Sequence, residues 1–319
     1  MLPNPPSNHM NNMYNGFTYN QPQLEHYVSS EERMVGFQKF VLRYGINDTF
    51  ASKLLGLDGY EIVLICDDSG SMNTILSDVS GPYNQSPTRW DELKHTVSIV
   101  VDLASVLDPD GVDIYFLNRE PMLNVRSSQE LIPVFAVAPE GPTPIVRVLR
   151  QVLHDKQKQI AERKLLILLA TDGVPTDDRG QANIDELRRV LAYERSSTER
   201  IPVTIIACTD DDNCMAYLNN WDTTIPNLDV VDDYKSEKNQ ILDCQGQSFP
   251  FSFGDYVVKI LMGGVDQWFD QLDEKKVSLD NYEQFKSASS TVLANAIIKN
   301  SHFSSYSPPT SLNSKYQHY

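Results

Sequence analysis

Five short apolar runs, separated by segments of helical periodicity, constrain this chain of 319 residues more than any other feature of its sequence. Polar residues rarely interrupt these runs, which is typical of strands that are buried on both faces of a sheet. Strands that alternate with helices form right-handed βαβ units around a mostly parallel sheet. The runs are Tyr60–Cys66, Val112–Leu117, Lys164–Ala170, Pro202–Cys208 and Leu228–Val231.

Helical patterns fill the intervals between the runs. Ser86 and Pro87 predict the start of the first helix, as an N-cap followed by proline at the first helical position. Apolar side chains then recur at steps of three and four residues in this helix and in three later ones, over 145–152, 184–191 and 257–268. In the last helix, Gly263 and Gly264 indicate close packing or a bend.

These patterns predict an α/β fold: a doubly wound, mostly parallel sheet with helices on both faces. A short antiparallel edge strand is expected near Leu123–Val125. Outside this α/β domain we expect a disordered tail, a small N-terminal helical appendage, a C-terminal helical extension and a second disordered tail. In chain order the five segments are 1–26, 27–57, 58–272 for the α/β domain, 273–299 and 300–319.

Charge and cysteine content narrow the classes of partner. The formal net charge is −16, whereas nucleic-acid backbones and anionic membranes bind clustered Lys and Arg, so we expect neither as a partner. The sequence has no signal-peptide pattern and no apolar run of membrane-spanning length, so we expect a cytoplasmic protein. The four cysteines match no zinc motif and are expected to be inert thiols: Cys66, Cys208, Cys214 and Cys244.

Oxygen-bearing side chains gather at one edge of the predicted sheet. The first strand runs directly into a D-x-S-x-S pattern formed by Asp67, Ser69 and Ser71. Thr143 comes just before a helix, and Asp172 follows the strand that ends near Ala170. Because α/β proteins bind ligands at the carboxyl ends of parallel strands, we expect these five side chains to converge.

The chemistry of this group predicts a metal ion. Carboxylate and hydroxyl oxygens with two formal charges suit Mg²⁺ or Mn²⁺ in octahedral geometry with retained waters, whereas zinc is expected with His or Cys. Because two carboxylates only balance the charge of the ion, we expect an open coordination position that attracts a carboxylate from outside.

The strand followed by D-x-S-G-S, the later lone Thr143 and the Thr171-Asp172-Gly173 turn resemble the von Willebrand factor A (vWA) domain family and its metal-ion-dependent adhesion site (MIDAS). The resemblance covers about residues 58–272 and implies a Rossmann-like vWA fold. It also implies a protein-binding module, whose partner supplies an acidic side chain to the ion; the lack of a secretory signal favours an intracellular one.

The same resemblance implies a role for each ligand. Ser69 and Ser71 would ligate the ion directly through their hydroxyls. Asp67 and Asp172 would do so directly or through water, and Thr143 would join when a partner is bound. Thr143 is also a good helix N-cap, so we hypothesise that it caps the helix until a partner carboxylate arrives.

Two acidic groups follow later strands at the same edge of the sheet. Asp210–Asp212 and Asp232–Asp233 have two interpretations, and the first is ordinary solvated loop charge. The second is an acidic rim, which repels anions until the ion is bound and then favours a partner with basic residues around its coordinating acid.

Three other interpretations stay open. One is a metal-independent scaffold or interaction domain, which would use its helical faces. Another is a Mg²⁺-dependent phosphatase-type hydrolase with Asp67 as nucleophile; however, Ser69 stands where such enzymes carry their second acid. No phosphate loop, dinucleotide turn or serine-hydrolase elbow is present, so we expect no enzyme activity. The third interpretation is that the D-x-S-x-S loop is only a structural turn, in a member of the vWA family that has lost its metal.

Overall fold

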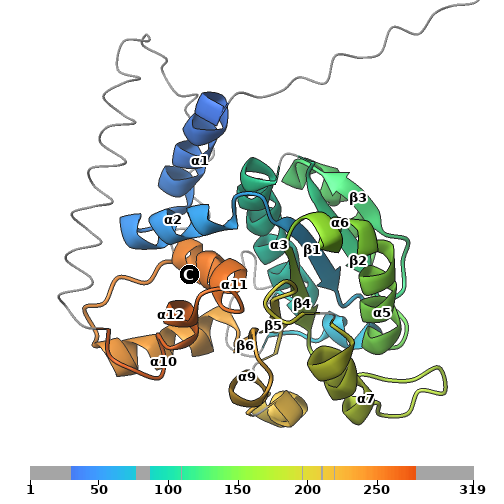
Figure 1. Ribbon diagram of the computed structural model, residues 1–319. Coiled ribbons are helices and arrows are strands. Elements are labelled where there is room, and N and C mark those ends of the chain that lie inside the picture. Colours follow the sequence, from blue (N-terminus) through green and yellow to red (C-terminus); the bar gives the residue numbers. More distant parts are fainter. Residues whose placement is uncertain are drawn as a thin grey trace, which may run out of the picture.

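Six strands form one sheet in the computed structural model, which describes residues 30–76, 87–108, 110–195, 197–209, 211–218 and 220–277 (Figure 1). Their order across the sheet is β3-β2-β1-β4-β5-β6, and all neighbours are parallel except β2 and β3. The predicted fold class and the antiparallel edge strand are confirmed. The strands are β1 (Glu61–Cys66), β2 (Val112–Phe116), β3 (Met122–Val125), β4 (Leu165–Thr171), β5 (Val203–Ala207) and β6 (Leu228–Val231).

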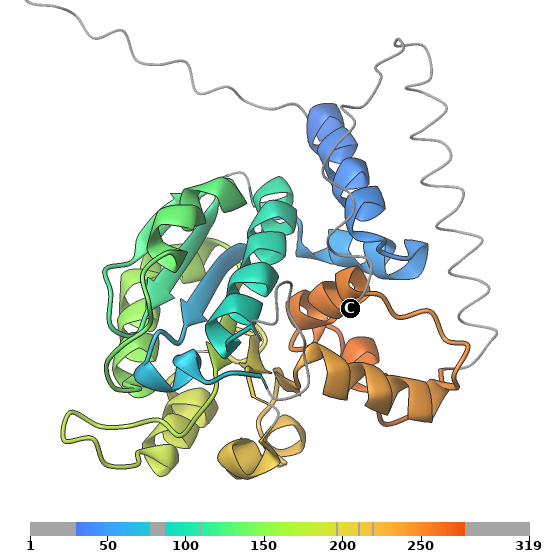
Figure 2. The same ribbon diagram turned by 180° about the vertical axis from the view of Figure 1, so that it is seen from behind.

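Helices lie on both sides of this sheet, and Figure 2 shows the molecule from behind. None of the helices in the described ranges has the length and hydropathy required to cross a membrane. The helices with ten or more residues are α1 (Ser30–Tyr44), α3 (Arg89–Leu107), α5 (Ile145–Asp155), α10 (Tyr234–Gln245) and α11 (Phe253–Met262). The shorter ones are α2 (Asp48–Leu54), α4 (Ile132–Phe135), α6 (Gln157–Glu162), α7 (Ile184–Arg189), α8 (Asp212–Met215), α9 (Trp221–Thr224) and α12 (Gln267–Asp270).

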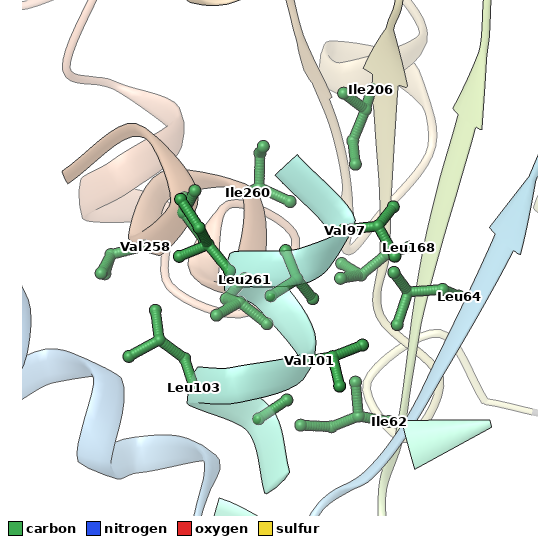
Figure 3. Close-up of a cluster of buried hydrophobic side chains, with 14 of the residues drawn as sticks. Ile62, Leu64, Val97, Val101, Leu103, Leu168, Ile206, Val258, Ile260 and Leu261 are labelled. Carbon is green, nitrogen blue, oxygen red and sulfur yellow. The ribbon is translucent and has the colours of Figure 1, made fainter. Parts of the chain in front are cut away.

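A hydrophobic core lies on each face of the sheet. Alternate residues of a strand point to opposite faces, so Ile62 and Leu64 of β1 enter one core, while Val63 and Ile65 enter the other. The first core is closed by α3 and α11, and the second by α5 and α7. Figure 3 shows the first core, where the labelled side chains of the sheet, Ile62, Leu64, Leu168 and Ile206, face those of the helices, Val97, Val101, Leu103, Val258, Ile260 and Leu261.

Helices α1 and α2 extend the first core. Phe50 of α2 is fully buried, and its ring contacts those of Phe251, Trp268 and Phe269. In the turn between α1 and α2, the backbone N–H of Asn47 donates to Asp255 Oδ1 of α11 over 2.8 Å. Residues early and late in the chain therefore pack together around one set of aromatic rings.

The first helix after β1 begins later than predicted. Arg89, and not Pro87, is its first residue, because Thr88 and Asp91 form a reciprocal capping box at this end. The predicted N-cap, Ser86, lies outside the described residues. So do residues 1–26, all of 273–299 beyond Val277, residues 300–319, and Asp210.

The last predicted helix is interrupted at its two glycines. Helix α11 ends at Met262, and the short helix α12 follows separately. A Cβ at Gly263 would collide with the carboxylate of Asp229, and one at Gly264 would lie 2.5 Å from the carbonyl oxygen of Val203. The glycines therefore allow the chain to pass close to the sheet after α11, as the close-packing interpretation expects.

Candidate metal centre

Asp67 connects the ends of the two central strands. Strands β1 and β4 pair in register up to Cys66 and Ala170, so the residues that follow them leave the sheet side by side. The Asp67 carboxylate accepts a hydrogen bond from the backbone N–H of Ser69 at 2.9 Å and one from Thr171 Oγ1 at 2.6 Å. Because both of its oxygens have a donor, this fully buried side chain is held in one orientation.

Ser71 lies between two other predicted ligands, Ser69 and Asp172. Its hydroxyl is 3.0 Å from Ser69 Oγ and donates to Asp172 Oδ1 at 2.7 Å. Ser69 and Asp172 are buried, whereas Ser71 is exposed, so the group opens to solvent on the Ser71 side. The structure therefore brings together Asp67, Ser69, Ser71 and Asp172, as the strand order predicts.

Thr143 is near these residues through its main chain. The loop that leads to it is joined to the loop after β1 that contains Ser69 and Ser71 (the serine loop), since Gly70 N donates to Gly141 O at 3.1 Å. Thr176, in the segment that follows β4, also holds the main chain of Thr143: Thr176 N donates to Thr143 O at 2.8 Å, and Thr143 N donates to Thr176 Oγ1 at 3.1 Å. Within the described part of the chain, however, no hydrogen bond joins the Thr143 hydroxyl to the other four predicted ligands.

The capping hypothesis for Thr143 is wrong. The N-cap position of α5 is occupied by Pro144, and no side chain caps this helix end. The carbonyl of Thr143, and not its hydroxyl, faces the first turn of the helix, because it accepts a hydrogen bond from Ile145 N at 2.9 Å. The hydroxyl of this half-buried residue is therefore not engaged in capping.

Two arginines at this edge were not anticipated from the sequence. Arg89 Nη1, on the first turn of α3, donates to Asp172 Oδ2 over 2.9 Å across 83 positions of the chain. Arg119 Nε lies 3.1 Å from Asp68 Oδ2, and Asn118 N donates to the other oxygen of that carboxylate at 2.8 Å. Neither arginine belongs to a recognisable motif, so no sequence signal predicts these pairs.

Burial governs the protonation of Asp67. It raises the pKa of Asp67 to about 6; hydrogen bonds from Ser69 and Thr171 oppose this rise, and the negative charge of Asp172 adds to it. The charge of Asp172 thus disfavours the charge of Asp67 in this largely buried site, and a cation between the two carboxylates would relieve that repulsion. Burial also raises the pKa of the Cys66 and Cys208 thiols, which disfavours reactive thiolates.

The oxygen spacing fits a small divalent ion. Octahedral ligands at the Mg²⁺–oxygen distance of about 2.1 Å lie about 3 Å from their neighbours. The Ser69–Ser71 and Ser71–Asp172 oxygen separations are 3.0 and 2.7 Å. Nowhere in the described ranges do three or more His, Cys, Asp or Glu side chains gather to hold a metal, so this donor set depends on its hydroxyls.

The two acidic groups at this edge have local partners. Asp233 caps α10 by accepting from Lys235 N at 2.9 Å, and Asp232 Oδ2 accepts from Gln240 Nε2 at 2.8 Å. Asp211 Oδ2 accepts from Cys214 Sγ at 3.3 Å. Helix capping therefore accounts for Asp233 without any ligand.

Comparison with known proteins leaves the family open. No protein family model and no curated protein matches the chain. Among solved structures, it is similar to a mutant of the PilB minor pilin from Streptococcus sanguinis at 14% identity and a TM-score of 0.40, covering 68% of this chain and 62% of that chain. It is also similar to the manganese-loaded TRAP protein from Plasmodium vivax at 16% identity and a TM-score of 0.32, covering 57% and 72%. The chain thus spans less than two thirds of the pilin, and at these TM-scores neither likeness assigns a family or a function.

Proposed function

We propose that this protein is a metal-dependent protein-binding module, which holds Mg²⁺ or Mn²⁺ at its sheet edge and uses it to bind an acidic side chain of a protein partner. The observation that supports this most directly is the spacing of the Ser69, Ser71 and Asp172 oxygens, 3.0 and 2.7 Å. These separations are those of hydrogen bonds, and they are also close to the edges of about 3 Å in an octahedral Mg²⁺ site, so the three oxygens could turn to an ion with little movement.

Asp67, Ser69, Ser71 and Asp172 would hold the ion, and Thr143 would join them when a partner is bound. When bound, the ion supplies a Lewis-acidic position that accepts a carboxylate oxygen. The hydroxyl ligands are neutral and the two carboxylates do not exceed the charge of the ion, so a coordination position is left for an external acid. The acidic character of the chain favours a partner with basic residues around that acid, and neither nucleic acid nor a membrane is proposed as a ligand.

We propose binding and not catalysis for this site. Asp67 follows the first strand, as a phosphatase nucleophile would, but both of its oxygens accept hydrogen bonds from the protein. Its neighbour two positions on is Ser69, which supplies no general acid. Phosphatase and esterase assays with Mg²⁺ are expected to give no turnover above that of Asp67→Ala.

Calorimetric titration of Mg²⁺ and Mn²⁺ tests the metal site. We expect saturable binding to the wild type, and a loss of at least about tenfold in affinity for Asp67→Ala and for Ser71→Ala. Ser98→Ala is the matched control, because the hydroxyl of Ser98 lies on α3 and donates to the Lys94 carbonyl of its own helix over 2.7 Å. Absence of uptake by the wild type would overturn the proposal.

Affinity capture with and without a chelator tests the partner. Proteins that are lost both from the chelated sample and from the Asp67→Ala sample are the metal-dependent partners. A partner that remains bound after chelation would instead support the metal-independent interaction domain. Asp211→Asn should weaken the binding of a basic metal-dependent partner, and unchanged or tighter binding counts against the acidic rim.

A further inference from the structure

Arg89 contacts the candidate metal centre from within the protein. Its Nη1 lies 2.9 Å from Asp172 Oδ2, and the two side chains are 10% and 0% exposed. The other oxygen of Asp172 accepts the hydrogen bond from Ser71. One carboxylate is therefore shared between a predicted metal ligand and a buried positive charge.

The backbone holds Arg89 in this place. Arg89 N donates to Thr74 O over 3.0 Å, three residues after Ser71. The next residues outward form a short antiparallel bridge, in which Ile75 pairs with Thr88. The capping box at Thr88 then sets the direction of the first turn of α3. The guanidinium thus faces Asp172 because the serine loop and the start of α3 are joined, and not only because a long side chain reaches across.

A charge count shows what this arginine does to the site. Among these three side chains, the ionised Asp67 and Asp172 carry two negative charges and Arg89 one positive charge, so together they carry one net negative charge without an ion. A divalent ion makes that one net positive charge, and a guest carboxylate then brings it to zero. Without Arg89, the charge is lower by one at each of these steps, which favours the ion and disfavours the guest carboxylate.

We infer that Arg89 sets the balance between the two ligands of this site: it weakens the binding of the divalent ion and strengthens the capture of the partner's carboxylate by the loaded site. The inference rests on the proposed metal-dependent function and adds to it a determinant of affinity. The protein would hold its ion loosely and favour the ternary complex with an acidic partner over the binary one with metal alone.

The inference predicts opposite changes in two affinities, which a purely structural arginine does not. Arg89→Gln keeps a hydrogen-bond donor for Asp172 and removes the charge. We expect its affinity for Mn²⁺, from calorimetry, to rise about tenfold. We expect the affinity of the Mn²⁺-saturated variant for acetate, followed by water-proton relaxation as acetate displaces metal-bound water, to fall by a similar factor. If Arg89 only supports the fold, both affinities fall together.

Three further variants make the experiment decisive. Arg89→Lys keeps the charge, and its affinities should stay within about threefold of the wild type. Arg119→Gln removes the other arginine of this edge, whose partner Asp68 is not a predicted ligand, and should change Mn²⁺ affinity much less than Arg89→Gln does. Arg89→Met carries the same two expectations if the Gln variant does not fold by circular dichroism.

The outcomes separate this inference from the proposed function. If the wild type takes up no Mn²⁺, the proposed function fails. If the wild type and Arg119→Gln bind Mn²⁺, but Arg89→Gln binds it equally or more weakly, the metal site stands and the role of Arg89 is overturned. An unchanged acetate affinity in Arg89→Gln also overturns it.

Discussion

Ser71 Oγ donates a hydrogen bond to Asp172 Oδ1 over 2.7 Å, although 101 positions of the chain separate the two residues. The contact joins the loop after β1 to the loop after β4, the two central strands of the sheet. Both residues therefore lie where a bound ion would couple the two loops, and ion binding should be measurable as a change in stability.

Divalent metal should stabilise the folded protein through this pair of loops. At a free concentration one hundred times its dissociation constant, an ion that binds only the folded state adds about 2.7 kcal/mol to the free energy of unfolding. We expect Mn²⁺ to raise the melting temperature of the wild type, and to raise that of Ser71→Ala and Asp172→Asn much less at the same concentration. Ser98→Ala should behave as the wild type, and equal shifts in all four proteins would contradict the assignment of the ligands.

Asp229 should make stability depend on pH. Burial raises the pKa of this carboxyl to about 8, and the nearby Lys259 opposes the rise without cancelling it. The folded state therefore binds the proton more tightly than the unfolded state, in which the pKa is about 4. The stabilisation of the folded state by this bound proton is complete below the unfolded pKa and is lost as the pH rises through about 8.

Asp229→Asn places a side chain at this position that is uncharged at every pH. The difference in stability between wild type and variant therefore isolates the effect of the Asp229 proton. We expect the free energy of unfolding of the wild type, relative to that of the variant, to fall by about 2 kcal/mol or more between pH 5 and pH 8 in urea titrations. Asp178→Asn, at a side chain that is 87% exposed, is the control and should show no such trend. A constant difference between wild type and Asp229→Asn would show that burial of this carboxyl does not govern its protonation.

Gly254 should be essential for docking the first two helices onto α11. A Cβ at this position would collide with the Tyr44 carbonyl oxygen and lie 2.8 Å from Ile46 Cγ1. Gly254→Ala is expected to lower the free energy of unfolding by about 2–3 kcal/mol, measured by chemical denaturation. Gly56→Ala serves as the control, because its Cβ would meet only Met262 Cε at 3.9 Å; a similar loss in both variants would argue against the close contact.

The aromatic cluster around Phe50 should contribute strongly to stability. Phe50 is fully buried, and its ring centroid lies 5.1 Å from that of Phe269 and 5.5 Å from that of Trp268. Phe50→Ala is expected to cost about 3–5 kcal/mol of unfolding free energy in urea titrations. Leu42→Ala, at a residue that is 82% exposed, should change it by less than about 0.5 kcal/mol, and a small effect at Phe50 would mean that α2 is not part of the core.

Strands that are buried along their whole length could be predicted from the sequence, because a continuous apolar run marks them. The apolar run Lys164–Ala170 contains most of β4, and every residue of that strand is buried. The predicted edge strand was found within one residue of its expected start, at Met122. The errors lie at helix ends, such as Pro87 and Thr143, where a few local hydrogen bonds decide the boundary and several neighbouring residues offer similar caps.

The amino-acid sequence by itself determined which residues leave the carboxyl ends of the central strands, and hence that Asp67, Ser69, Ser71 and Asp172 meet. Hydrophobic periodicity and the direction of parallel strands are local or general properties, so they can be inferred from the order of residues. Only the tertiary structure decided that Arg89 pairs with Asp172 and that Asn47 bonds to Asp255. Such contacts depend on angles and distances between packed elements, which the spacing of residues along the chain does not specify.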